Sequence, residues 1–161
     1  MKKTQRGFAL LVAVIFMSVM LSFGLALGSL GYKQQVLASA AIESQYAFYV
    51  ADSALECALY ADQQQNLFAY PSSDPALAPV MTCDGSPAIT ATKSWSASQW
   101  IVSERLSLDS GARCADVTVY KPALFSDQTY LFSQGYNVSC ATVAGNPDGA
   151  RFVSRGLSAH Y

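Results

Sequence analysis

The feature that most restricts the fold of this chain is a long stretch without charge near its N-terminus. No Asp, Glu, Lys or Arg occurs from Phe8 to Tyr32. As an α-helix, a stretch of this length would extend for roughly 37 Å, and the hydrocarbon core of a bilayer is about 30 Å thick. The apolar region of a secretory signal has only about 7–15 residues. We therefore expect residues 8–32 to form a retained transmembrane helix.

The basic residues around this stretch predict its orientation. Lys2, Lys3 and Arg6 precede it, whereas Lys33 is the only basic residue in the sixty positions that follow it. Because basic residues favour the cytoplasmic side, the N-terminus is expected in the cytoplasm and the remainder of the chain outside. The expected location is thus the cytoplasmic membrane, crossed once with the N-terminus in and the C-terminus out.

The composition after the stretch argues against several functional classes. Seven basic and eleven acidic residues follow Tyr32, a net charge of −4, and they include no basic cluster of the kind that binds nucleic acid. The four cysteines are widely spaced with no CxxC pair, and His160 is the only histidine. This pattern favours disulfides in an extracytoplasmic domain over a zinc site. We predict no metal and no cofactor.

Nothing in the sequence interrupts a helix between Phe8 and about Asn66. The first proline is Pro71, and residues 33–66 are rich in Ala, Leu, Gln and Glu. This outer half is amphipathic at 100° per residue, which predicts either a helix packed on a sheet or a surface helix with a solvated side. Its polar side carries Gln45, Asp52, Glu56 and Gln63, and its apolar side carries Val36, Ala40, Ala47, Val50, Ala54, Ala58 and Ala61.

The remainder of the chain predicts a loop followed by strands. Pro, Ser, Asp and Gly concentrate between Tyr70 and Pro87, so residues 67–98 are assigned to a loop region and residues 99–161 to a sheet domain. The expected fold class is α+β, a long helix on a small antiparallel sheet. Runs of β-branched and aromatic residues between turn signals predict four strands, at about Trp100–Leu108, Cys114–Lys121, Thr129–Ser139 and Arg151–Ser158.

In one of the three possible connectivities of the four cysteines, each disulfide would enclose a local segment of the chain. Cys57 lies near the outer end of the long helix and Cys83 lies in the loop that leaves it. Cys114 opens the second proposed strand and Cys140 follows the third, which places them side by side in an antiparallel pair. Of the three possible connectivities, we therefore favour Cys57–Cys83 with Cys114–Cys140.

The junction before the apolar stretch carries a family resemblance. The leader Met1–Gly7 is short and basic, it ends in Gly7, and Phe8 opens the apolar helix at once. This resembles the class III signal of type IV prepilins and pseudopilins. The resemblance implies cleavage between Gly7 and Phe8 by a prepilin peptidase, followed by N-methylation of Phe8. The stretch Ala47–Tyr60, which reads AFYVADSALECALY, is similar to the same part of many pilin-like helices.

One position departs from the pattern of the family. Most major pilins have Glu at the fifth mature position, where this chain has Val12. In the family, that carboxylate is thought to pair with the N-terminal amine of a neighbouring subunit, and subunits without it tend to be minor ones. A lone carboxylate in lipid is costly, so its usual presence indicates function. We therefore favour a minor pilin or pseudopilin over a major filament subunit.

Three functional classes follow from these observations. The first is a structural subunit of a type IV pilus or type II secretion-like filament, whose partners are other pilin subunits, the prepilin peptidase, the assembly machinery and membrane lipid. The alternative is a signal-anchored extracytoplasmic binding domain that enters no filament. An anchored enzyme is disfavoured because a catalytic triad would have to use His160, close to the C-terminus. Asp52 and Glu56 are better explained as polar residues on the exposed side of the helix than as paired catalytic carboxylates.

Overall fold

The structure is a computed structural model that describes residues 5–69, 76–122, 128–145 and 152–161, with the backbone alone for residues 5–7. The chain divides into two compact units, residues 1–41 (the first unit) and residues 42–161 (the second unit). Helix α1 (Gln5–Gln63) belongs to both. The leader residues 1–4 lie outside the described residues.

Helix α1 has 59 residues and ends three positions before the predicted boundary. Its C-terminal end is closed by a hydrogen bond from the Leu67 N–H to the Ala61 carbonyl oxygen, 2.9 Å long. Asn66 has a positive φ of 51° there, a left-handed conformation that Asn tolerates better than most residues do. The chain thus leaves the helix through a turn, and residues 64–69 are not α-helical.

In the second unit, one side of α1 is buried, as the amphipathic pattern predicts. Ala47, Val50, Ala54, Ala58 and Ala61 are buried and lie on that side, together with Ala51 and Leu55. Most of them are alanines, so the helix backbone can approach the sheet closely. The prediction was wrong for Val36 and Ala40, which are exposed. Both belong to the first unit, whose described residues are helix alone and include no sheet to cover them.

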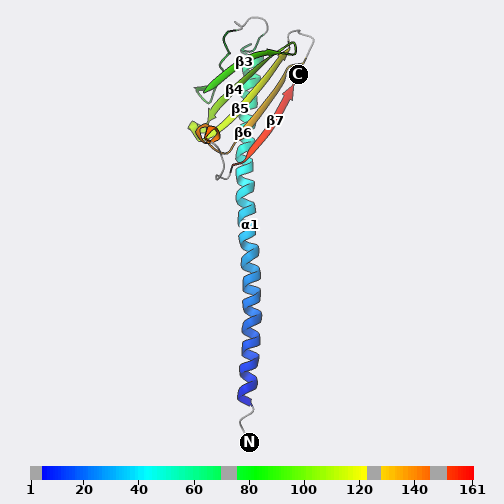
Figure 1. Cartoon of the computed structure of the whole chain (residues 1–161), viewed down its shortest axis with the longest axis vertical. Coiled ribbons are helices and arrows are strands. Elements are labelled where there is room, and N and C mark those ends of the chain that lie inside the picture. The colour runs from blue at the N-terminus through cyan, green and yellow to red at the C-terminus, as the bar shows by residue number, and fades with distance from the viewer. Residues whose placement is uncertain (1–4, 70–75, 123–127, 146–151) are drawn as a thin grey trace. The chain divides into compact units, whose positions relative to one another are not determined.

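The second unit contains a five-stranded antiparallel sheet whose strands follow the order of the sequence (Figure 1). Each strand pairs with the next one along the chain, so the sheet needs no crossover. The α+β fold class is therefore confirmed. The strands are β3 (Thr90–Ser96), β4 (Gln99–Leu108), β5 (Arg113–Pro122), β6 (Tyr130–Tyr136) and β7 (Ser154–His160).

The largest difference from the sequence analysis is β3, which lies inside the predicted loop region 67–98. Its sequence, TATKSWS, alternates small polar residues with Ala91, Lys93 and Trp95, so it lacks the apolar period that marks a strand. It is an edge strand, and pairing with β4 stabilises it over its whole length. Upstream in the same region, β1 (Thr82–Cys83) and β2 (Ser86–Pro87) form a short separate hairpin.

The third and fourth predicted strands differ from the structure at their ends. Strand β6 stops at Tyr136, and a short helix, α2 (Cys140–Ala144), follows after three residues. The Ser139 side chain caps this helix by accepting a hydrogen bond from the Thr142 N–H. Strand β7 begins at Ser154 rather than at Arg151, which lies outside the described residues.

The sheet register places the apolar side chains on the face that α1 covers. Val102 of β4 lies beside Val119 of β5, and Val119 lies beside Leu131 of β6. These three residues are buried together with Leu106, Val117 and the alanines of α1 in one core. Gly135 of β6 is the point of closest approach, because a Cβ atom built there would lie 2.3 Å from the carbonyl oxygen of Ala47.

Two disulfides join the cysteines, in the connectivity that the sequence analysis favours. Cys57 of α1 is bonded to Cys83 of β1, and Cys114 of β5 is bonded to Cys140 at the start of α2. Each bond links residues 26 positions apart. The first attaches the β1–β2 hairpin to the helix, and the second attaches α2 to the sheet.

Peptide mapping without reduction is expected to recover only these two linkages. In the chain-entropy model, closing each loop contributes about 3 kcal/mol, which is a large share of the stability of a small domain. Reduction should therefore lower the urea midpoint of the second unit markedly. A peptide that joins Cys57 to Cys114 or to Cys140, or four free thiols, would contradict this connectivity.

Candidate functional site

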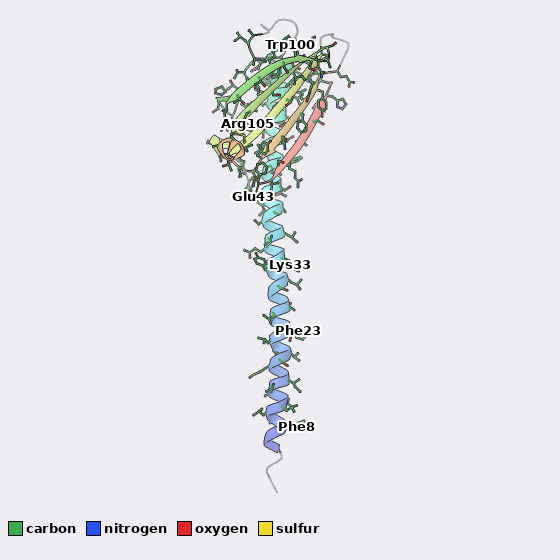
Figure 2. The ribbon with its side chains drawn as sticks, in the orientation of Figure 1. Phe8, Phe23, Lys33, Glu43, Trp100 and Arg105 are labelled. Carbon is green, nitrogen blue, oxygen red and sulfur yellow. A yellow bond between two sulfur atoms is a disulfide. The ribbon has the colours of Figure 1, made fainter. Side chains whose placement is uncertain are left out.

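The apolar segment, residues 8–32 of α1, is the most distinctive surface of the described chain. Among the described residues, one helix is long and apolar enough to cross a membrane, and this segment lies within it, near the N-terminus. Its large side chains are exposed throughout, Phe8 for example by 72%. They project outward from the helix, as Phe8 and Phe23 illustrate in Figure 2. So much exposed apolar surface is unfavourable in water, so lipid or other protein must cover it.

The three serine hydroxyls of the apolar segment need no water as a hydrogen-bond partner. The Ser18 hydroxyl donates to the Ile15 carbonyl oxygen at 2.8 Å, Ser22 donates to Ser18 at 2.8 Å, and Ser29 donates to Ala26 at 2.9 Å. These bonds run back along the helix by three or four residues, as is usual for serine in helices surrounded by lipid. The segment can therefore lie in hydrocarbon without leaving a serine hydroxyl unpaired.

The predicted cleavage site falls at the beginning of the helix. The backbone of Gly7 is already helical, and Phe8 is the first residue whose side chain is described. Val12 is half-exposed and apolar, so this turn of the helix offers no carboxylate. At Gly24, Gly28 and Gly31, an added Cβ would meet no atom within 4 Å beyond its chain neighbours and the adjacent helix backbone. Packing among the described residues therefore does not require glycine at these three positions.

Three polar links join the outer half of α1 to the sheet within the second unit. The Arg155 guanidinium donates to the Ser44 hydroxyl at 2.8 Å, and the Asn137 amide donates to the Glu43 carboxylate at 2.9 Å. At the other end of the sheet, the Lys121 ammonium pairs with the buried Asp62 carboxylate at 2.6 Å. These links fix the helix on the sheet.

The Asp62 carboxylate also receives a hydrogen bond from the hydroxyl of Tyr161. Burial, followed by the bond to Asp62, raises the pKa of this tyrosine well above its ordinary value. The second oxygen of Asp62 has no hydrogen-bond partner among the described residues. One oxygen of Asp62 accepts from both Lys121 and Tyr161. These contacts connect the end of α1 to β5 and to the residue that follows β7.

A buried carboxylate also lies in the centre of the core. Glu104 of β4 is only 3% exposed and points to the helix side, between Val102 and Leu106. Its two oxygens accept the Met81 N–H at 3.1 and 3.3 Å. Burial raises the pKa of this carboxyl to about 7, while the Met81 hydrogen bond opposes the shift. The bond holds the segment before β1 against the sheet.

The stability of the second unit is expected to fall between pH 4.5 and pH 8. The pKa of Glu104 is higher in the folded state, about 7, than the 4.5 of the unfolded state, so its contribution is complete below pH 4.5 and is lost as the pH rises through 7. Glu104→Gln keeps an oxygen for Met81 and should stabilise the protein at pH 8 by about 3 kcal/mol relative to the wild type.

Urea denaturation of both proteins at pH 4.5 and pH 8 checks this expectation. Glu56→Gln, which changes an exposed carboxyl on α1, provides the matched control. If Glu104→Gln destabilised the protein equally at both pH values, the carboxyl would not titrate as described.

The polar residues that the sequence analysis considered lie on two separate elements. Asp52 is half-buried and Glu56 is exposed on α1, whereas His160 is exposed at the end of β7. Trp95 and Trp100 pack edge to face across the β3–β4 hairpin, with ring centroids 5.0 Å apart. Among the residues that the structure describes, no group of three or more His, Cys, Asp or Glu is placed to hold a metal ion.

Comparison of the chain with protein-family models, with curated proteins and with solved structures found no match. These comparisons assign the chain to no family.

Sequence reasoning missed the buried carboxylates Asp62 and Glu104, although the alternation of β4 could have indicated Glu104. In the run Val102–Leu106, Glu104 occupies the position that alternation assigns to the apolar face. A charged residue at such a position indicates a buried, hydrogen-bonded carboxyl. Asp62 lies on α1 four positions after the buried Ala58, but its partners Lys121 and Tyr161 are distant in the sequence, so this pairing could not be predicted.

Proposed function

We propose that this chain is a structural subunit, of the minor pilin or pseudopilin type, in a type IV pilus or a type II secretion-like filament. The observation that carries the proposal is the junction at Gly7 and Phe8. A short basic leader ends there in glycine, and an uncharged helical segment with exposed side chains begins directly. Removal of the leader on the cytoplasmic side would leave the whole segment attached to the second unit.

The apolar segment supports this proposal because it can serve in two environments. Before assembly it anchors the subunit in the lipid of the cytoplasmic membrane. In a filament the same exposed side chains pack against the helices of other subunits, through van der Waals contacts. Gly24, Gly28 and Gly31, which packing among the described residues does not require, permit close approach of a second helix.

The second unit supports the proposal as the part presented outside the membrane. Its two disulfides suit an oxidising compartment, and its polar links hold the sheet on the outer half of α1. The partners are other pilin subunits, the prepilin peptidase, the assembly machinery and membrane lipid. The role is structural and uses no catalytic group or cofactor.

A minor subunit is expected to be scarce in purified filaments. Val12 occupies the position where a carboxylate would pair with the N-terminal amine of a neighbouring subunit, so successive copies lack that contact. Quantitative mass spectrometry of sheared filaments should find this chain at a small fraction of the amount of another pilin. Finding it as the bulk protein would show that helix packing alone recruits successive copies, and would contradict the minor assignment.

The alternative is an anchored extracytoplasmic domain that enters no filament, and the same preparation distinguishes the two. A filament subunit is recovered in the sheared fraction in cells that assemble filaments and is absent from it when assembly is blocked. An anchored domain stays in the membrane fraction in both cases, and that outcome would exclude the proposed function.

A further inference from the structure

The second unit contains a pocket of about 600 Å³ beside α1, on the side of the Cys57–Cys83 disulfide. Tyr46, Tyr49 and Ser53 of α1 form one wall. Further lining comes from the turn that joins β1 to β2, with Asp84, and from the turn that joins β4 to β5, with Asp109. This volume is within the range of pockets that hold small ligands or peptide side chains.

The walls of the pocket are fixed to one another. The Cys57–Cys83 disulfide attaches the β1–β2 turn to the helix. The Asp109 N–H donates to the Asp84 carboxylate at 2.9 Å, which joins the two turns. Asp84, Asp109 and Ser110 all have positive φ values between 50° and 54°, conformations that residues other than glycine adopt at an energetic cost. Because such conformations persist only where the surroundings hold them, the pocket is preorganised.

Among the described residues that line the pocket, Asp84 and Asp109 are acidic and Arg113 is basic, and Arg113 is engaged within the protein. The Arg113 guanidinium lies 4.0 Å from the centre of the Tyr46 ring, pairs with Asp109 at 3.3 Å and donates to the Asn137 carbonyl oxygen at 3.1 Å. Its side chain is only 19% exposed, against 67% for that of Asp109. Asp84 is also exposed, so a visiting group meets a net negative charge.

The aromatic wall adds a second attraction for a cation. The side chain of Tyr49 is 62% exposed, and Tyr49 lines the pocket from α1, whereas the two carboxylates come from the turns. An aromatic face attracts a cation through its quadrupole, and a neighbouring carboxylate adds a charge interaction. Lysine and arginine side chains offer both a cation and an apolar stem, which suits a pocket of mixed polarity.

We propose that this pocket binds the cationic side chain of a lysine or arginine that a partner protein presents on an exposed segment. Asp84 receives the charge, assisted by Asp109, which it shares with Arg113, and Tyr49 covers the stem and the head group. The inference does not rest on filament assembly, since a partner could dock on the second unit in either setting.

Titration of the full chain in a non-ionic detergent tests the proposal, with capped Gly-Lys-Gly and Gly-Arg-Gly as probes and capped Gly-Glu-Gly as the negative comparison. The NMR amide signals of Tyr49, Ser53 and Ser110 report on the pocket. The basic probes should shift these signals and the acidic probe should not. Because exposed charge pairs are screened, added salt should weaken the binding.

Three variants locate the binding. Asp84→Asn keeps an oxygen for the Asp109 N–H and should weaken binding of the basic probes about threefold, and Asp84→Asn with Asp109→Asn should weaken it roughly tenfold. Tyr49→Ala should weaken it about threefold as well. Glu56→Gln removes an equal charge from a position outside the pocket and should have no effect.

Three outcomes would overturn the proposal: shifts caused equally by Gly-Glu-Gly, an equal loss in Glu56→Gln, or no shift at these amides with either basic probe. Each would leave the proposed structural role untouched, because that role depends on the leader and the apolar segment.

Discussion

Gly135→Ala is expected to destabilise the second unit by about 3 kcal/mol or more. A Cβ at this position would lie 2.3 Å from the Ala47 carbonyl oxygen and 2.3 Å from the Ala51 backbone nitrogen. Both are backbone atoms of α1, so no side-chain rotation can relieve the contact. The helix would have to move away from the sheet, and the buried alanines of α1 would lose their packing.

Gly156→Ala provides a matched control for this effect. Gly156 also lies in a strand of the same sheet, but its added Cβ would meet the end of the Phe132 ring, at 3.0 Å, rather than backbone. That ring can move, so the cost should stay below about 1 kcal/mol. Urea denaturation followed by the fluorescence of Trp95 and Trp100 measures both variants. Equal midpoints for the two would show that α1 does not lie as close to β6 as described.

Gly7→Val is expected to abolish removal of the leader. In the proposed function a peptidase cuts the bond between Gly7 and Phe8, and a β-branched side chain at Gly7 would hinder its approach to that bond. Co-expression with an active prepilin peptidase, followed by an immunoblot, should show only the longer form for this variant and the shorter form for the wild type.

Thr4→Val is the control for this variant, since it also places valine in the leader but away from the bond. It should be processed as the wild type is. If Gly7→Val were shortened as efficiently as Thr4→Val, the glycine would have no role in processing and the resemblance of the leader would carry no function.

The sequence was sufficient to predict the parts of the fold that local residue patterns determine. The uncharged stretch and the absence of proline before Pro71 predicted one long helix, and runs of β-branched and aromatic residues between turn signals predicted β4 and β5 to within a residue or two. The side of α1 that faces the sheet was also predictable, because the alanines from Ala47 to Ala61 recur with the helical period.

The remaining features depend on contacts between distant residues. Strand β3 has little apolar alternation and is stabilised by its pairing with β4. The close approach at Gly135 depends on where α1 crosses the sheet, which no local pattern encodes. Likewise, the pocket beside Tyr49 exists only because a disulfide and the Asp84–Asp109 bond bring two turns to the helix.

Intact-mass analysis of the protein recovered from membranes of cells with an active prepilin peptidase tests the central claim most directly. The account predicts a chain that begins at Phe8, carries one added methyl group on its N-terminal amine and contains two disulfides. Fragmentation of the N-terminal peptide would place the methyl group. A chain that still begins at Met1 under these conditions would contradict the proposed function.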